Sequence, residues 1–515
     1  MDLSQLLSQH ARYRPNQLAV VFEGTQLNYR EFNARVNCVA NALLGNGLTI
    51  GDKVATILPN CLELLEVYWA AAKIGLVVVP LSPLLRGAGL TTLLNDSDTA
   101  LVVTNRDFVP ILDEIKRDLP AISSDRYLLT DALDENAPAG YRDYHAVVAG
   151  ASDSEPPRVD LSDDHPYNII YSSGTTGLPK GIVLTHGVRA LYGVLFGSAW
   201  RMTPESVVLH AGSLIFNGAF LTLMPALYFG STYIFLHHFE ADLLIKTIEQ
   251  ERVTHIYMVP AQIVAMLNSP LFSAERLKSL EMIGTVGAPL HKQHREELTR
   301  RLPGVFYELY GVTEGFMTIL DKTHYATKPM SVGVPPQFCD IRILNEKGEA
   351  LPPGEVGEIV GRSPFLMAGY YKRPDLTAKA MAGGWLRSGD LGYVDEDGFL
   401  FLVDRQKDMM ISGGVNVYPR DIEEVVVQHP AVREAAVFGI PSDKWGESPL
   451  AAVVLRQPGA ITAEELRAWV NQRVAAKYQQ VAQVVLMDEF PRNAAGKILK
   501  RVMREPYWAN RETQI

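Results

Sequence analysis

The chain has 515 residues, of which 47% are hydrophobic and 21% charged, and its formal net charge is −10. Such a composition is typical of a globular protein with a large core, and the acidic balance argues against broad nucleic-acid binding, which requires a basic face. Cys38, Cys61 and Cys339 form no CxxC pair and no zinc-like cluster, so we expect buried thiols in a reducing compartment and a cytoplasmic protein.

The beginning of the chain and its most apolar stretch bear on membrane targeting. The first residues contain no basic stretch followed by an apolar run, so no signal peptide is expected. Residues 213–236 are strongly apolar, but Asn217, Pro225 and a Gly-Ser-Thr turn at 230–232 interrupt them. A spanning helix needs about 20 mostly apolar residues without such breaks. We therefore expect a buried helix, a turn and a buried strand here, and no transmembrane segment.

Short apolar runs alternate with helical patterns through most of the chain. Residues 54–58, 77–80 and 100–103 have the composition of buried strands, and residues 62–73 carry apolar side chains at helical spacing. The same alternation returns at residues 206–209, 232–236, 255–259 and 281–286. Strands that alternate with helices predict parallel-rich sheets with helices packed on their faces.

The pattern changes twice towards the C-terminus. Within residues 331–403, glycines and prolines separate short strands, which we expect at 340–344, 357–361 and 400–402. A helix at 420–428, strands at 432–440 and 450–455, a helix at 462–477 and a strand at 483–487 follow. We predict an α/β fold with an N-terminal domain over residues 1–404, which includes the β-rich subdomain at 331–403. A small, mobile α+β domain over residues 405–515 completes it.

A loop rich in glycine and hydroxyl side chains follows a predicted strand at 167–171. Its sequence over residues 171–181 is YSSGTTGLPKG, and its candidate phosphate-binding residues are Ser172, Ser173, Gly174, Thr175, Thr176, Gly177 and Lys180. Glycines let backbone N–H groups approach an anion, hydroxyls donate to phosphate oxygens, and a lysine neutralises charge. Pro179 takes the place of the second glycine of a Walker loop, which disfavours a P-loop kinase or ATPase. A flexible surface linker is the alternative that this composition alone leaves open.

The segment YSSGTTGLPKGIVLTH resembles the signature of the adenylate-forming enzymes, which include acyl-CoA and aryl-CoA ligases, nonribosomal peptide adenylation domains and luciferases. The resemblance implies that a carboxylate and ATP form an acyl-adenylate and pyrophosphate, usually before a thioester forms. Further motifs of that family follow in order: GAP at 287–289, YGVTE at 310–314, WLRSGD at 385–390, DRQKD at 404–408 and PRNAAGKI at 491–498.

The resemblance implies a role for each matching residue around ATP. Gly287, Ala288 and Pro289 would lie beside the adenine, and Tyr310, followed by Gly311, would stack on it. Thr313 would contact the α-phosphate and Glu314 would bind Mg²⁺, which prefers carboxylate and phosphate oxygens. Asp390 would accept from the ribose hydroxyls, Arg405 would reach the ribose or a phosphate, and Lys180 would steady the departing pyrophosphate.

The C-terminal motifs imply the second half of the reaction. Lys407 would be the hinge about which the C-terminal domain rotates, and Lys497 would hold the carboxylate against the α-phosphate and offset its developing charge. The segment ISGGVNVYP resembles that of CoA ligases, where Gly413 and Gly414 would let the pantetheine pass close to the backbone. We therefore expect ATP, Mg²⁺ and CoA as cofactors.

Two other functions compete with a carboxylic acid–CoA ligase. One is a stand-alone adenylation enzyme that loads its acyl group on a carrier protein. The other is a nucleotide-binding sensor or scaffold that has lost catalysis, and the presence of Lys497, Glu314 and Asp390 argues against it. We expect the acid, ATP and CoA as binding partners, and a homodimer as an open alternative to a monomer.

The acyl pocket, by resemblance, is lined by Phe216, Asn217, Met258, Gly315, Phe316 and Met317. This apolar lining favours a fatty or aromatic acid. None of these segments contains an arginine that could pair with a second carboxylate. Asn217 stands where many members of the resembled family carry a histidine, so this position departs from the family pattern.

Overall fold

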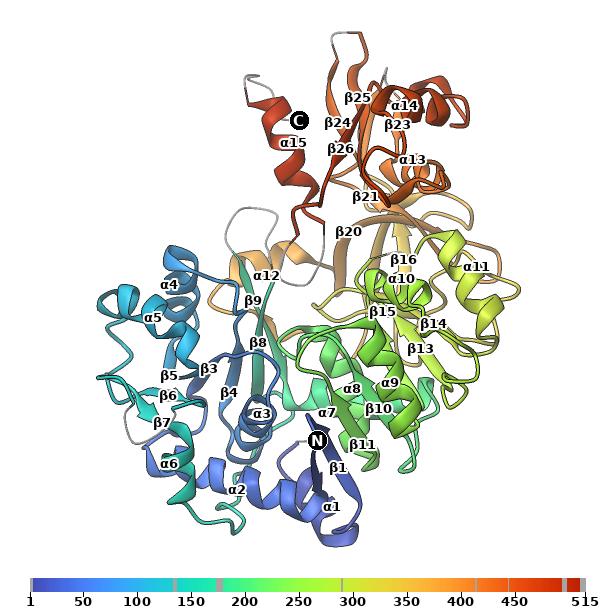
Figure 1. Ribbon diagram of the computed structural model, residues 1–515. Helices are drawn as coiled ribbons and strands as arrows, with labels where there is room; N and C mark the ends of the chain where they lie inside the picture. The colour runs from blue at the N-terminus through green and yellow to red at the C-terminus, as the bar shows by residue number, and fades with distance from the viewer. Residues whose placement is uncertain are drawn as a thin grey trace.

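The computed structural model describes residues 3–132, 137–172, 179–288, 290–412, 415–442, 444–492 and 498–509 (Figure 1). Within these residues the strands form four sheets, two of eight strands and two of five. The predicted fold class is confirmed: a large α/β body carries both eight-stranded sheets, and a β-rich sheet and a small α+β unit follow it. Figure 1 shows that the last unit, in orange and red, stands above the body and is joined to it beside β21.

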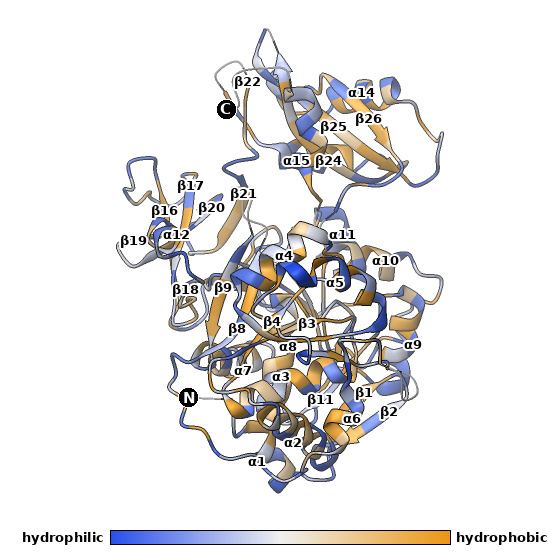
Figure 2. Ribbon diagram, turned by 90° about the vertical axis from the view of Figure 1, so that its left-hand side faces the viewer, coloured by the Kyte–Doolittle hydropathy of each residue, from blue (hydrophilic) through white to orange (hydrophobic). Residues whose placement is uncertain are grey.

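One eight-stranded sheet carries both sides of the glycine-rich loop. Its strand order is β18-β9-β8-β4-β3-β5-β6-β7. The strands are β3 (Lys53–Ile57), β4 (Val77–Pro80), β5 (Thr99–Thr104), β6 (Tyr127–Leu129), β7 (Arg142–Asp143), β8 (Pro166–Ser172), β9 (Lys180–Thr185) and β18 (Gly369–Tyr370). Strands β3, β4, β5 and β8 are parallel, whereas β9 is antiparallel to both β8 and β18. All four residues of β4 are buried, because helices cover both faces of a parallel sheet, and Figure 2 shows these strands as hydrophobic.

The other eight-stranded sheet has the order β15-β14-β13-β12-β10-β11-β1-β2. Its strands are β1 (Leu18–Phe22), β2 (Thr25–Asn28), β10 (Val207–His210), β11 (Thr232–Phe235), β12 (His255–Met258), β13 (Met282–Thr285), β14 (Phe306–Gly311) and β15 (Met317–Leu320). Six of its strands are parallel and pair in the order β1, β11, β10, β12, β13 and β14. Their carboxyl ends therefore meet at one edge, where ligands of such sheets bind.

Helices cover these two sheets. They are α1 (Leu6–Tyr13), α2 (Tyr29–Gly45), α3 (Leu62–Ile74), α4 (Gly87–Asp96), α5 (Val109–Ile115), α6 (Tyr144–Ala149), α7 (His186–Ala199), α8 (Asn217–Phe229), α9 (Ala241–Glu251), α10 (Pro260–Asn268) and α11 (Lys292–Arg301). The apolar segment at 213–236 forms α8 and β11 as predicted, with Gly230 in the left-handed region (φ 73°) between them. None of the helices within the described ranges is long and apolar enough to cross a membrane.

Two glycines bring α7 and α8 close together. A Cβ atom on Gly193 would lie 2.8 Å from Tyr228, and one on Gly197 would lie 2.1 Å from the Phe229 ring. Both contacts join the C-terminal halves of the two helices, while Arg189 of α7 and Asn217 of α8 meet at their beginnings. The helices thus run side by side in the same direction.

The β-rich sheet is formed by β16 (Asp340–Leu344), β17 (Gly357–Arg362), β19 (Met381–Ala382), β20 (Trp385–Val394) and β21 (Leu400–Arg405), and α12 (Pro374–Ala380) precedes β19. The three strands that we predicted here are present. Its core includes Tyr310 and Phe316, which come from the end of β14 and the turn after it. The β-rich sheet is therefore packed against the edge where the nucleotide motifs lie.

The last unit contains β22 (Met410–Ser412), β23 (Val415–Val417), β24 (Val432–Ser442), β25 (Gly446–Leu455), β26 (Gln483–Met487), α13 (Pro419–Val426), α14 (Ala463–Asn471) and α15 (Lys500–Trp508). The helix predicted at 462–477 was too long, because α14 ends at Asn471. The Asn471 side chain donates to the Val481 carbonyl (3.0 Å) and accepts from the Val481 amide (2.7 Å), which holds the returning chain beside the helix end.

Polar contacts link this unit to the body. His291 Nδ1 lies 3.0 Å from Glu424 Oε1, and the Gln293 amide donates to the Val427 carbonyl at 3.2 Å. These contacts join α11 and the residue before it to α13 and the residue after it. The hydrogen bond and the charge of His291 outweigh the effect of burial and lower the pKa of Glu424.

Candidate active site

The two ends of the glycine-rich loop lie side by side. Ser172 ends β8 and pairs in register with Lys180, which begins β9. The loop therefore connects two neighbouring antiparallel strands, and the predicted strand that leads into it is confirmed. Some of the predicted site residues lie outside the described residues: Ser173, Gly174, Thr175, Thr176, Gly177, Pro289, Gly413, Gly414 and Lys497.

Lys180 and Glu314 are brought together through Tyr370. The Lys180 ammonium lies 4.9 Å from the centre of the Tyr370 ring, a cation–π contact. The Tyr370 hydroxyl donates to Glu314 Oε1 at 2.8 Å. Burial, together with the negative charge of Glu314, raises the pKa of Tyr370, so the phenol remains a donor. We did not single out Tyr370 from the sequence, because nothing local indicates that β18 pairs with β9.

The turn that carries Glu314 is held by backbone contacts. Met367 N donates to the Glu314 carbonyl at 2.8 Å, and Gly315 N donates to the Val312 carbonyl at 3.0 Å. Gly315 has φ 127°, and a Cβ atom there would lie 2.1 Å from the Phe365 carbonyl, so only glycine fits. Thr313 is partly exposed in this turn. The turn thus presents Thr313 and Glu314 from a rigid base.

Tyr310, Asp390 and Arg405 form a second group. The Tyr310 hydroxyl donates to Asp390 Oδ2 at 2.9 Å, and Arg405 Nε lies 3.4 Å from Asp390 Oδ1. Asp390 and Arg405 face each other on β20 and β21, so the strand register sets their contact. Burial and the Asp390 charge raise the pKa of Tyr310. The roles of these residues towards adenine and ribose remain predictions.

Gly287, Ala288 and Gly311 follow neighbouring strands. Gly287 and Ala288 are exposed just after β13, and Gly311 is partly exposed at the end of β14. Because β13 and β14 are parallel neighbours, these residues share the sheet edge with Tyr310. A Cβ atom on Gly311 would lie 2.8 Å from the Phe316 carbonyl, so a larger residue would disturb the turn.

The predicted acyl-pocket residues divide between three regions of the core. Phe216 is partly buried against the same apolar cluster as the buried Met317, together with Val286. Asn217 begins α8 and is partly buried. Met258 is buried in the neighbouring cluster, which contains Ile263.

Phe316 has a different environment. Its ring packs on Gly361, where a Cβ atom would lie 2.0 Å away, and it belongs to the core of the β-rich sheet. The side chain of Phe316 therefore packs the turn that carries Glu314 against the β-rich sheet. Among the predicted pocket residues, Phe216 and Met317 belong to one apolar cluster, and Asn217 follows Phe216 in the chain.

The predicted pocket segments contain no arginine, but an arginine of α7 contacts one of the predicted pocket residues. Arg189 is fully buried, and its Nη1 donates to Asn217 Oδ1 at 2.9 Å. Its position after the glycine-rich loop indicates only a residue in the first turn of a helix. The pairing of α7 with α8 had to be known before Arg189 could be connected with the pocket.

The predicted hinge lies in the turn between β21 and β22. Lys407 is exposed there. Just before it, Asp404 accepts hydrogen bonds from the backbone amides of Arg405 (2.7 Å) and Arg420 (3.0 Å). Asp404 thereby joins the β-rich sheet to the first turn of α13.

No group of three or more histidine, cysteine, aspartate or glutamate side chains within the described ranges could hold a metal ion alone. Glu314 nevertheless fits Mg²⁺, which is commonly bound by one or two carboxylates together with substrate phosphates. Its Oε1 accepts from Tyr370, and no described residue donates to Oε2.

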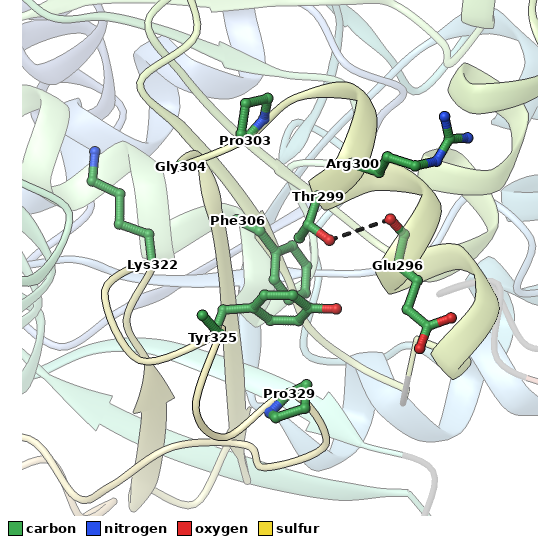
Figure 3. Close-up of a pocket in the computed structure, with 10 residues that line it drawn as sticks. Glu296, Thr299, Arg300, Pro303, Gly304, Phe306, Lys322, Tyr325 and Pro329 are labelled. Atoms are coloured by element: carbon green, nitrogen blue, oxygen red, sulfur yellow. Dashed lines mark hydrogen bonds between the residues drawn. The ribbon is translucent and has the colours of Figure 1, made fainter.

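A hollow elsewhere on the surface does not involve these residues. Figure 3 shows its lining from α11 and the segment after β15, including Glu296, Arg300 and Tyr325. The Tyr325 ring meets Phe306 edge to face at 5.5 Å between centroids. The Lys322 side chain points away from this ring pair (Figure 3). The hollow thus has no convergent charged groups, in contrast to the site around Glu314.

Known proteins match this chain over nearly its whole length. The family model described as AMP-binding enzyme matches residues 7–371, and the model for the AMP-binding enzyme C-terminal domain matches residues 421–497. Feruloyl-CoA synthase of Amycolatopsis sp is 36% identical over 506 residues, which cover 96% of this chain and 97% of that protein.

Two further relatives cover nearly the whole chain. A fatty acid–[acyl-carrier-protein] ligase, ScoC, of Streptomyces coeruleorubidus is 31% identical over 100% of this chain and 98% of its own length. The structure of o-succinylbenzoate CoA synthetase (MenE) from Bacillus subtilis, in complex with the acyl-adenylate intermediate OSB-AMP, matches with a TM-score of 0.85. The two sequences are 27% identical, and the match covers 99% of each chain.

Proposed function

The chain belongs to the AMP-binding enzyme family, and from this premise we propose that it is an AMP-forming carboxylic acid–CoA ligase. In the first step, a carboxylate oxygen of the acid bonds to the α-phosphorus of ATP and pyrophosphate leaves. In the second, the sulfur of CoA bonds to the acyl carbon and AMP leaves. The observation that carries this proposal is the convergence of Lys180, Tyr370 and Glu314 beside Tyr310, Asp390 and Arg405.

Some residues of the site would contact the phosphates of ATP, and others would contact its nucleoside. Lys180 lies at the end of the glycine-rich loop, where its charge favours the departing pyrophosphate. Tyr370 fixes one oxygen of Glu314 and leaves the other for a cation. Glu314 would hold Mg²⁺, which would neutralise phosphate charge. Asp390, which contacts Tyr310 and Arg405, would accept from sugar hydroxyls.

The acid is an aromatic or fatty acid in this proposal. The partly buried Phe216 and Val286 and the buried Met317 supply apolar surface at the edge of the sheet. The names of the relatives support the same classes, since one is a feruloyl-CoA synthase and another a fatty acid ligase.

The movement of the C-terminal unit is part of the proposal. We place the boundary at residues 404 and 405, with Lys407 as the pivot and Lys497 as the lysine that approaches the carboxylate. The small number of polar contacts between α11 and α13 supports a unit that can leave its present position.

The reaction can be tested with the purified chain and a panel of aromatic and fatty acids. With ATP and Mg²⁺, we expect AMP and pyrophosphate as products, and a thioester by mass spectrometry only when CoA is added. Release of ADP would exclude the proposal. Acid-dependent exchange of pyrophosphate into ATP without any CoA thioester would favour a carrier protein as acceptor, a role that the relative ScoC has by name.

Lys497 offers a direct test of the adenylation step. We expect Lys497→Ala to lower the rate of pyrophosphate exchange by about 100- to 1,000-fold, because a charge opposite the developing negative charge is lost. ATP binding, measured by calorimetry, should change little. Lys477→Ala is a matched control, since this lysine is exposed in the same unit, and it should behave as the wild type. An unchanged exchange rate in Lys497→Ala would contradict the assignment.

A further inference from the structure

Arg189 enters the interface between α7 and α8 at the beginning of both helices. It lies one helical turn before Gly193 and two before Gly197, the residues at which α8 approaches α7 closely. This spacing places Arg189 on the face of α7 that meets α8. Its side chain therefore lies next to Asn217, the first residue of α8.

The surroundings of Arg189 are neutral. Its guanidinium lies 3.9 Å from the centre of the Phe220 ring, its Nε donates to Asn168 Oδ1 at 3.2 Å, and its Nη1 donates to Asn217 Oδ1 at 2.9 Å. Throughout the described ranges, no carboxylate lies within 4.0 Å of it. Burial lowers the pKa of Arg189 to about 10, so the side chain is still a cation at neutral pH.

A second buried arginine, Arg295, is paired with a carboxylate and serves as a comparison. Arg295 is also fully buried, but its Nη2 lies 2.5 Å from Glu308 Oε2, and its other nitrogens donate to carbonyl oxygens. A buried charge without a partner is costly. In addition, Arg189 Nη2 and Asn168 Nδ2 are buried and have no acceptor within the described part of the chain. The region around Arg189 thus has surplus donors and a surplus positive charge.

The contact with Arg189 also fixes the orientation of the Asn217 amide. A guanidinium has only donors, so the atom of Asn217 that faces it must be Oδ1, and Nδ2 must point away. Asn217 is partly exposed, and its Nδ2 is neither buried nor bonded to an acceptor among the residues described. The beginning of α8, where Phe216 makes no side-chain cap, adds free N–H groups at the same place.

The place where these donors meet is close to the reaction site. Phe216 and Val286 are partly buried beside Asn217, and a Cβ atom on Gly218 would lie 3.9 Å from Val286. The Tyr192 ring, 5.0 Å from the Arg189 guanidinium, lies 6.0 Å from the Phe365 ring. The Phe365 carbonyl in turn lies against Gly315, next to Glu314. Two successive aromatic residues, Tyr192 and Phe365, therefore connect Arg189 with the turn of Glu314.

We propose that Arg189 is a positioning residue that turns the Asn217 amide into the acyl site, where this amide and the start of α8 form a subsite for an anionic oxygen of the acid substrate, next to the buried charge of Arg189. The proposal rests on the proposed function, since it assumes that an acid binds there. The oxygen belongs either to the carboxylate that reacts or to a second acidic group on the acyl chain. The substrate would supply the negative charge that the protein does not place beside Arg189.

The test is steady-state pyrophosphate release by the full chain, with KM measured separately for the acid and for ATP. The acids are cinnamate and its para-carboxy derivative, and decanoate and decanedioate. We expect Arg189→Met to raise KM for the acid about 10- to 100-fold, as for the loss of a charge-assisted interaction, and to leave KM for ATP within about twofold. Arg189→Lys should recover part of the loss. Asn217→Asp should resemble Arg189→Met, because its carboxylate would pair with Arg189.

The two sources of the anionic oxygen give different patterns. An equal rise in KM for the monoacids and the diacids identifies the reacting carboxylate, and a rise confined to the diacids identifies the distal group. Either pattern supports the subsite. If KM for the acid is unchanged in Arg189→Met, or if KM for the acid and for ATP rise together, the proposal is wrong.

Thermal unfolding separates a functional role from a structural one. Arg295→Met should lower the melting temperature, because it leaves Glu308 buried and unpaired. Arg189→Met should keep or raise it, because it removes an unpaired buried cation. A lowered melting temperature with an unchanged KM for the acid would make Arg189 a structural residue. If Arg189→Met does not fold, Arg189→Lys and Asn217→Asp decide by the same kinetic criterion. Failure of the wild type to release pyrophosphate with any acid would instead overturn the proposed function.

Discussion

Tyr370 connects residues that are far apart in the sequence. It lies on β18, a two-residue strand that pairs with β9, and its ring meets Lys180 while its hydroxyl meets Glu314. The ammonium and the carboxylate therefore share one scaffold, although neither contacts the other through a hydrogen bond. At the scale of single residues, this tyrosine links two of the motif residues.

The hydroxyl of Tyr370 can be tested alone. We expect Tyr370→Phe to lower kcat/KM for ATP by roughly 10- to 100-fold, because Glu314 loses a charge-assisted hydrogen bond while the ring under Lys180 is kept. The measurement is pyrophosphate release over a range of Mg²⁺ concentrations. Tyr371→Phe is the matched control, since that hydroxyl contacts Asp98 on the surface. Equal activity of Tyr370→Phe and the control would show that the contact does not matter for ATP.

At the scale of elements, the sequence patterns predicted most strands and helices. The strand at 340–344 and the strand at 483–487 have the predicted bounds, and α8 with β11 replaces the apparent membrane segment. The exception, α14, ends early because Asn471 bonds to Val481, a residue that is distant from it in the helix pattern. Local periodicity cannot show such a contact.

The close approach of α7 and α8 gives a prediction for one glycine. Gly197→Ala should lower the free energy of unfolding by about 1–3 kcal/mol, because the new methyl group would collide with the Phe229 ring. Gly45→Ala is the control, since it lies at the end of α2 with open space around its Cβ position. Chemical denaturation should show a loss only for Gly197→Ala, and equal stability of the two variants would contradict the packing argument.

At the scale of the whole molecule, Asp404 joins the β-rich sheet to the C-terminal unit. This carboxylate, on the last strand of the β-rich sheet, accepts from the Arg420 amide at the start of α13. Lys500 of α15 forms an ion pair with Glu423 of α13 at 2.6 Å in the same region. Burial raises the pKa of Asp404 from 3.8 to about 6, against the opposing effect of the Lys500 charge.

The raised pKa of Asp404 predicts a dependence of stability on pH. The folded chain holds this proton up to about pH 6, whereas the unfolded chain loses it near pH 4, so the folded state binds more protons between these values. The contribution of Asp404 to stability is therefore present below about pH 4 and is lost as the pH rises through about 6, by up to about 3 kcal/mol.

Asp404→Asn removes this titration. Compared with the wild type, the variant should gain stability at about pH 8 relative to about pH 5, as measured by urea unfolding. Asp375→Asn, which alters an exposed carboxylate on α12, should change stability equally at both pH values. If Asp404→Asn were as costly at the higher pH as at the lower, the folded chain would not hold the Asp404 proton up to about pH 6.

The sequence by itself determined the family, the order of the motifs and the type of most elements, because these depend on residues that are neighbours in the chain. YSSGTTGLPKG and YGVTE identify the nucleotide machinery without any structure. Only the tertiary structure decided which side chains meet. It placed Tyr370 between Lys180 and Glu314, and it moved Phe316 into the core of the β-rich sheet. It also brought Arg189 into contact with Asn217, while no described carboxylate pairs with the guanidinium. These contacts depend on the pairing of β18 with β9 and of α7 with α8, and such pairings are set by packing between distant segments rather than by local pattern.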